Sequence, residues 1–210
     1  MAKLPSNSPL AGVSGRIGDV VTYVSNGITI VRALPKRRND HKSSILQQQH
    51  LNSFKAKHDF ARSIKQSIID RIWKQVAIPV GMNPYNYFIK SNNDAFGKTD
   101  HVEFPQLMIL SAGKLLPVEN LKLEVANNML LLSWTSKLIN VYASANDRLI
   151  IALLSDKKNL HLFNTRSIRS EEKAELELGE LNTDIIEGYI FWSSSNDKVF
   201  SRSEYWCYRK

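Results

Sequence analysis

The pattern of short apolar runs after Pro117 constrains the fold more than any other feature of the sequence. Short runs of aliphatic, β-branched and aromatic residues follow one another there, separated by turn residues such as Asn127-Asn128 and Asp156-Lys157-Lys158. We predict strands at residues 120–125, 129–134, 148–155, 160–164, 174–178, 186–193 and 199–208. Six or seven strands in so short a segment indicate two antiparallel sheets packed against each other.

A β-hairpin is predicted around Asn26-Gly27 in the N-terminal part of the chain. Two runs rich in β-branched residues, 19–24 and 28–32, lie on either side of this dipeptide. A tight turn between such strands needs positive φ at both central positions, which Asn and Gly tolerate better than other residues do. A glycine-containing loop at residues 12–18 precedes the hairpin, and we expect it to have a defined shape.

The apolar pattern changes period between residues 43 and 76. Apolar side chains recur there at spacings of three and four, which predicts one long amphipathic helix. The apolar stripe consists of Leu51, Phe54, Ala61, Ile64, Ile68, Ile72 and Val76. A second, shorter helix is expected at about residues 84–95, with Asn83 as its N-cap, Pro84 in its first turn and Gly97 at its end.

Together these elements predict an α+β fold in two parts. Residues 1–115 would form a basic hairpin–helix region, and residues 116–210 an all-β sandwich of the immunoglobulin-like kind. Residues 116–134 resemble the opening of fibronectin type III domains, in which a tryptophan at the position of Trp134 packs into the core. Because the chain has no cysteine pair, an antibody-type domain is excluded.

The net charge of +8 is concentrated in the N-terminal part of the chain. Residues 1–80 contain 13 Lys and Arg against four Asp and Glu, whereas residues 116–210 contain 12 against 13. Such asymmetry is typical of proteins that bind nucleic acid, dock on an acidic partner, or complement a neighbouring copy of themselves. Charge alone does not choose among these three classes.

Nucleic-acid binding through the basic N-terminal half is the alternative hypothesis. The contiguous Lys36, Arg37 and Arg38 could neutralise phosphates. However, the basic residues of the predicted long helix are spread around its circumference rather than aligned in one stripe. The segment also lacks interleaved aromatic residues on which bases would stack. Contact with a protein surface therefore ranks above nucleic-acid binding.

No motif in the chain points to a reaction, a cofactor or a metal. Gly12 lies two residues before Ser14, as in a nucleophile elbow, but the glycine that the motif needs two residues after the serine is replaced by Arg16. Residues 15–18 have the form of an RNA-clamping GXXG loop, although they lead into a strand rather than joining two helices. Glu175 and Glu177 alternate with leucines, as on the solvated face of an edge strand. We expect a protein without catalytic residues, cofactor or metal site.

The single cysteine and the N-terminus bear on the compartment. Cys207 lies in a strand-like run without a neighbouring histidine, so we expect a buried or half-buried structural thiol. A chain with one cysteine forms no internal disulfide, which fits a reducing compartment. The first residues lack the apolar core of a signal peptide, and no stretch approaches the roughly 18 apolar residues of a membrane span. We expect a cytoplasmic protein without a membrane span.

Four short motifs mark the N-terminal half of the sequence. Ser14-Gly15-Arg16-Ile17-Gly18 is followed by a hairpin that ends in Val31-Arg32, by Gln47-Gln48-Gln49 at a helix start, and by Asn83-Pro84-Tyr85. This set resembles an uncharacterised family of bacterial proteins, mostly from Bacteroidota, whose members share an SG-[KR]-[IV]-G loop and a variable β-rich C-terminal part. The resemblance implies no activity and no catalytic residues. Where family members have a Thr-Pro-x-Gln helix start, this chain has Lys42-Ser43-Ser44.

These observations favour a non-enzymatic structural or protein-interaction component that associates with itself or with another protein. A loop shaped by glycines, a hairpin and a long helix joined to a sandwich suit an assembly. In such an assembly the edge strands of one molecule extend the sheet of a neighbouring molecule. We identify no small-molecule substrate. The candidate interaction residues are Ser14, Gly15, Arg16, Gly18, Arg32, Lys36, Arg37 and Arg38.

Overall fold

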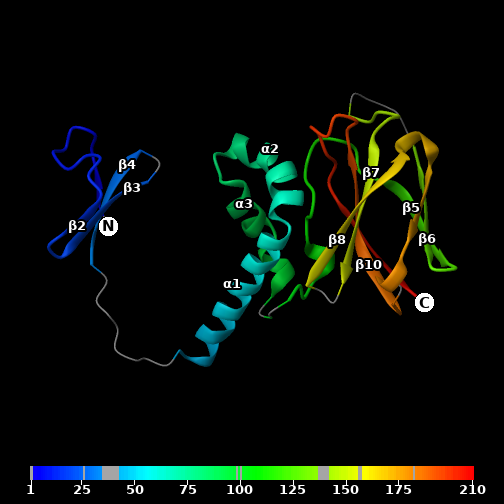
Figure 1. Ribbon diagram of the computed structural model, residues 1–210, viewed down its shortest axis with the longest axis horizontal. Helices are drawn as coiled ribbons and strands as arrows, with labels where there is room; N and C mark the ends of the chain where they lie inside the picture. The colour runs from blue at the N-terminus through cyan, green and yellow to red at the C-terminus, as the bar shows by residue number, and fades with distance from the viewer. Residues whose placement is uncertain are drawn as a thin grey trace. The chain divides into compact units, whose positions relative to one another are not determined.

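The computed structural model describes residues 2–25, 27–34, 43–97, 99, 101–136, 142–155, 158–181 and 183–210. The chain divides into two compact units, Met1–Ser43 and Ser44–Lys210 (Figure 1). The boundary expected between residues 115 and 116 does not coincide with this division. The helices belong with the C-terminal strands because they share a hydrophobic core with them.

The N-terminal unit is a four-stranded antiparallel sheet with the strand order β1-β4-β3-β2. Its strands are β1 (Ala2–Leu4), β2 (Gly15–Ile17), β3 (Val20–Ser25) and β4 (Ile28–Ala33). The predicted hairpin is confirmed, since β3 pairs with β4 up to the Ser25–Ile28 pair. Gly27 has a φ of 75°, the left-handed region that a tight hairpin turn requires. The glycine-containing loop is partly a strand, because its residues 15–17 form β2.

The predicted long helix is present but interrupted. Helix α1 (Ile45–Ser63) gives way to a π-helix, η1 (Lys65–Trp73), then to α2 (Lys74–Ala77) and the 3₁₀ helix η2 (Ile78–Val80). The π segment begins where the Ile69 amide reaches the Ile64 carbonyl five residues earlier, at 3.3 Å. Four side chains of this segment are buried, those of Ile68, Ile69, Ile72 and Trp73.

A capping box begins α1. The Ser44 hydroxyl accepts from the Gln47 amide at 3.2 Å, and the Ser44 amide donates to Gln47 Oε1 at 2.9 Å. Ser44 and Gln47 therefore cap this helix without the Thr-Pro pair of the resembled family. Two members of the predicted stripe are exposed, Leu51 at 59% and Phe54 at 60%, and a third, Val76, is only half-buried. Between Leu51 and Phe54 in the sequence, Ser53 is buried, so these two side chains lie on a different side of α1 from the one that contacts the Gly97 turn. The first turns of α1 extend away from the other helices and the strands (Figure 1).

The second predicted helix is confirmed as α3 (Pro84–Ser91), followed by the 3₁₀ helices η3 (Asn93–Phe96) and η4 (Pro105–Leu107). Asn83 caps α3, since its Oδ1 accepts from the Tyr85 amide at 2.9 Å. Gly97 ends η3 with a φ of 52°. Its carbonyl accepts from the hydroxyl of the buried Ser53 at 2.9 Å, which joins this turn to α1.

Seven strands follow, close to the predicted positions. They are β5 (Glu119–Ala126), β6 (Met129–Thr135), β7 (Arg148–Ser155), β8 (Asn159–Ile168), β9 (Lys173–Glu177), β10 (Ile185–Ser193) and β11 (Glu204–Arg209). Two 3₁₀ helices flank β9, η5 (Arg169–Glu171) and η6 (Gly179–Leu181). The strands form two antiparallel sheets with the orders β11-β10-β7-β8 and β5-β6-β9. The protein thus has a mixed α+β fold.

The Ser44–Lys210 unit has three layers, with the four-stranded sheet in the middle (Figure 1). Alternate residues of β7 belong to two different cores. Ile150, Ala152 and Leu154 pack with the helices, while Leu149, Ile151 and Leu153 pack with the three-stranded sheet. A sheet buried on both faces has no solvated side, which explains why β7 reads as an unbroken apolar run.

Candidate functional site

The N-terminal sheet has no hydrophobic core of its own. Among its described residues, only Thr22 and Thr29 are buried, at 2% and 4% exposure, and no apolar side chain is. Several large apolar side chains are instead 39–46% exposed, namely those of Leu10, Val13, Ile17, Val24 and Ile28. A unit of this size without buried apolar side chains is marginally stable in water on its own, and association with another surface would stabilise it.

Strand register sorts the side chains of this sheet onto two faces. Paired residues share a face, and residues two apart along a strand share it as well. One face, which we name the arginine face, consists of Lys3, Arg16, Val21, Tyr23, Ser25, Ile28, Ile30 and Arg32. The opposite face contains Thr22 and Thr29, and the loop before β2 is attached to it, since the Gly12 amide donates to Thr29 Oγ1 at 2.8 Å.

The arginine face brings together two of the residues predicted from sequence. Arg16, Val21 and Arg32 form one row across β2, β3 and β4. The Arg32 guanidinium lies 5.6 Å from the ring centroid of Tyr23 on the same face. Arg16 Nε donates to the Gly18 carbonyl at 2.9 Å. Two cations therefore flank an apolar centre on this face.

The remaining predicted residues have other positions. Gly15 belongs to the edge strand β2, where its carbonyl accepts from the Thr22 hydroxyl at 3.2 Å. Ser14 and Gly18 lie just before and after that strand, and both are exposed. These three residues shape the edge of the sheet. Residues Lys36, Arg37 and Arg38 lie outside the described residues.

A second exposed apolar surface covers the first half of α1, and it was not predicted from sequence. Ile45 and Leu46 are 76% and 62% exposed, and Leu51 and Phe54 follow two turns later. The Phe54 ring contacts the His58 ring in a tilted arrangement, with 4.2 Å between the ring centroids. The Tyr85 hydroxyl donates to the His58 carbonyl at 3.0 Å and so fixes this part of α1 to α3.

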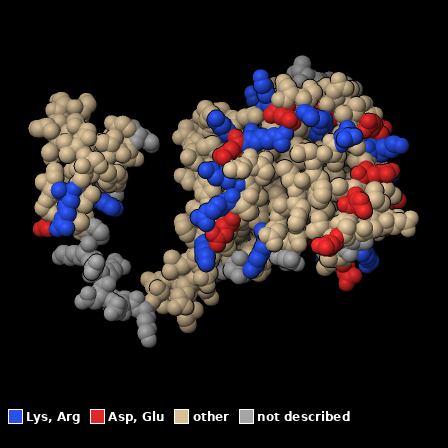
Figure 2. Space-filling view, viewed as in Figure 1, with Lys and Arg blue, Asp and Glu red and all other residues tan. Residues whose placement is uncertain are grey.

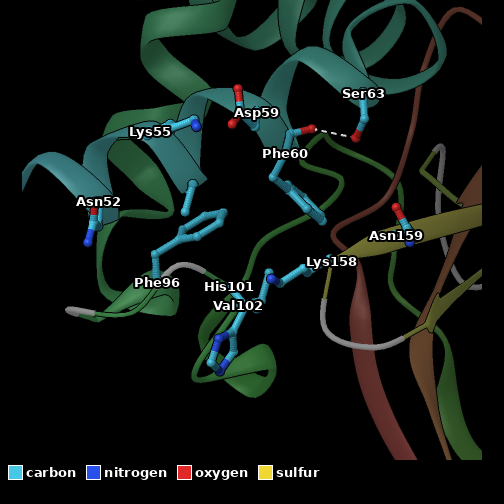
Figure 3. Close-up of a pocket in the computed structure, with 11 residues that line it drawn as sticks. Asn52, Lys55, Asp59, Phe60, Ser63, Phe96, His101, Val102, Lys158 and Asn159 are labelled. Atoms are coloured by element: carbon cyan, nitrogen blue, oxygen red, sulfur yellow. Dashed lines mark hydrogen bonds between the residues drawn. The ribbon is translucent and has the colours of Figure 1, made fainter.

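A groove of about 520 Å³ opens between α1, the segment around residue 101 and the start of β8 (Figure 3). Its floor consists of the buried side chains of Phe60, Phe96 and Val102. Polar and charged side chains line it as well, those of Asn52, Lys55, Asp59, Ser63, His101, Lys158 and Asn159. Ser63 Oγ donates to the Phe60 carbonyl at 2.8 Å, within its own helix.

Cys207 is exposed, contrary to the expected buried or half-buried thiol. It lies on β11, an edge strand, where its neighbour Trp206 points into the core between the sheets. Alternation along the strand therefore directs the thiol outward. The described part of the chain contains no group of three or more His, Cys, Asp or Glu that could hold a metal ion. None of its described helices is long and apolar enough to cross a membrane.

Comparisons with known proteins give no indication of the function of this chain. No protein-family model and no curated protein matches the chain. Among solved structures, it is similar to a redesigned β-sandwich protein, with a TM-score of 0.33 and 12% identity over 46% of this chain and 90% of that one. It is also similar to the spore cortex lytic enzyme SleM of Clostridium perfringens, with a TM-score of 0.32 and 12% identity over 46% of this chain and 29% of that one.

Proposed function

We propose that this protein is a non-enzymatic structural component that associates with further copies of itself through its N-terminal sheet. The observation that supports the proposal is the absence of buried apolar side chains among the described residues of that sheet. Burying apolar surface contributes about 25 cal/mol per Å², so a partner that covers a face of the sheet would stabilise it substantially. Most soluble assemblies are built from copies of one chain.

The fold assignment belongs to the same proposal. We propose that residues 116–210 form an immunoglobulin-like sandwich of the fibronectin type III kind. The strand orders β5-β6-β9 and β11-β10-β7-β8 correspond to strands A-B-E and G-F-C-C′ of such a domain. Trp134 on β6 supports this assignment, because it is 5% exposed and packs edge-on against Trp192 at 5.3 Å. In this chain only the three-stranded sheet of that domain leaves its outer face to solvent, because the helices cover the outer face of the four-stranded sheet.

Light scattering on a sizing column tests the self-association. The full-length chain would be run at several concentrations, at low and high salt, with absorbance at 260 and 280 nm recorded together. We expect a mass above that of one chain which rises with concentration, in peaks free of nucleic acid. A monomer at every concentration would overturn the proposal. A monomer that carries nucleic acid and sheds it at high salt would favour the alternative hypothesis, since phosphate contacts weaken steeply with salt.

A further inference from the structure

The outer face of the three-stranded sheet offers a charge pattern opposite to that of the arginine face. In β5, β6 and β9, Glu124 pairs with Leu131, and Leu131 pairs with Glu175, so the three form one row. Both glutamates are exposed, and the leucine is half-buried. The neighbouring row ends in Glu177 beside Met129. We name these five residues the glutamate face. The next row on the same side of the sheet, Lys122, Ser133 and Lys173, carries two exposed lysines, so the acidic character belongs to the glutamate row and to Glu177.

Neighbouring side chains place this face on the outside of the sandwich. Leu130 and Leu132, which flank Leu131 along β6, are buried at 0% and 2% exposure in the core between the sheets. Successive residues of a strand point to opposite sides, so Leu131 and its row partners point away from that core. Figure 2 shows acidic side chains on the side of the unit where β5 and β6 lie, with a few basic ones among them.

The two rows match in order and in spacing. The arginine face presents a cation, the aliphatic Val21 and a second cation, on three adjacent strands. The glutamate face presents a carboxylate, the aliphatic Leu131 and a second carboxylate, also on three adjacent strands. Because adjacent strands are about 4.8 Å apart in any sheet, the outer members of both rows have nearly the same separation. Sheet faces pack about 10 Å apart, which lets apolar centres meet while the flanking charges pair.

We propose that the arginine face of one copy docks on the glutamate face of a second copy. This inference rests on the proposed self-association and names the surfaces through which it occurs. The occupant is a second copy because the chain itself carries the complementary acidic row. Each copy presents both faces on different units, so the contact is heterologous and links copies head to tail, as a ring or an open chain.

A charge-reversal pair tests the docking in the full-length chain. One variant carries Arg16→Glu and Arg32→Glu, the other Glu124→Arg and Glu175→Arg. All four positions are exposed, so the folds should persist, which circular dichroism would verify. Each variant alone brings like charges together at the contact. We expect its apparent dissociation constant to rise about a hundredfold, because like-charge juxtaposition at an interface is strongly unfavourable.

Mixing the two variants supplies the decisive result. The reversed arginine face then meets a reversed glutamate face, and the two unaltered faces meet each other. We expect the mixture to regain the assembly that neither variant forms alone, by light scattering. A control variant, Lys74→Glu with Lys90→Glu, makes the same change in net charge as the arginine-face variant, on exposed helical residues, and should associate like the parent chain.

The failures of the two proposals are distinguishable. A parent chain that is monomeric at all concentrations overturns the self-association itself. A parent chain that assembles while both charge-reversed variants assemble equally well overturns only the docking surfaces. Failure of the mixture to assemble, when each variant alone is monomeric and folded, also overturns the pairing of these faces.

Discussion

Arg169 and Asp147 form an ion pair that is almost completely buried. Their side chains are 5% and 2% exposed, and Arg169 Nε lies 3.2 Å from Asp147 Oδ2. The guanidinium also donates to the Leu116 carbonyl at 3.0 Å and lies 4.5 Å from the ring centroid of Trp192. Burial lowers the pKa of Arg169, and the charge and hydrogen bond of Asp147 oppose that shift. Each charge therefore depends on the other to remain in the interior.

Asp147→Ala should destabilise the protein strongly. The substitution leaves the Arg169 guanidinium buried without its counter-charge, which costs about 3–5 kcal/mol in the free energy of unfolding. Guanidinium chloride denaturation measures this loss. Asp59→Ala is the matched control, because Asp59 pairs with Arg62 at side-chain exposures of 50% and 73%. That exposed pair contributes less than about 1 kcal/mol. Equal losses in the two variants would contradict the prediction.

Individual residues show where sequence reasoning succeeded and where it failed. The alternation of Glu175 and Glu177 with leucines correctly indicated the solvated side of the edge strand β9. The periodicity of Leu51 and Phe54 was equally clear, but they are exposed because the side of α1 that is buried at this point is the one that carries Ser53. A sequence pattern reports which side chains could be buried together. It does not report whether a second surface is present to bury them.

Among the elements, the π-helix η1 is fixed to the turn between β10 and β11 by ion pairs. Arg71 lies 2.9 Å from Asp197 Oδ1, and Arg148 lies 3.3 Å from Asp197 Oδ2. Ser193 Oγ also donates to Asp197 Oδ1 at 2.6 Å. Burial alone would raise the pKa of Asp197, but the hydrogen bond from Ser193 and the charges of Arg71 and Arg148 outweigh it and lower the pKa.

Asp197→Asn should reduce stability at neutral pH but not in acid. Because the pKa of Asp197 is lower in the folded state, its carboxylate stabilises the fold above its unfolded pKa of about 3.9, and this contribution is lost as the pH falls through the folded value. The side chain is 38% exposed, so solvent screening keeps the contribution below about 1 kcal/mol. Urea unfolding of both proteins at pH 7 and near pH 3 measures the difference. A difference that is the same at both pH values would refute this assignment.

The elements themselves were mostly predictable, whereas their association was not. Strand positions followed from alternation and turn residues, and α3 followed from its Asn-Pro start. The interruption of the long helix by η1 left no mark in the apolar spacing. The hydrogen bonds of a π-helix span five residues and those of an α-helix span four, a difference too small to change the three- and four-residue spacing of the apolar side chains. The packing of helices on the four-stranded sheet did have a signal. The apolar run of β7 lacks the alternation of a half-solvated strand, which indicates that both of its faces are covered.

For the whole molecule, hydrogen exchange should distinguish the two units. The N-terminal sheet lacks buried apolar side chains among its described residues, so its amides should be poorly protected in a dilute, dissociated sample. At concentrations that favour association, deuterium uptake in β1–β4 should slow. Amides of β7 and β10, between two cores, should exchange slowly at both concentrations and serve as the reference. Slow exchange of β1–β4 in the dilute sample would contradict the need for a partner copy.

The middle position of the four-stranded sheet has a consequence for how the Ser44–Lys210 unit comes apart. Its strands provide one wall of each core, with neighbouring residues of β7 assigned alternately to the two. Displacing β7 would therefore empty both cores at once, and neither the helices nor the three-stranded sheet would keep a surface to pack on. Helices and strands that lie far apart in the sequence are in this way bound into one cooperative folding unit, which melts in a single step rather than layer by layer.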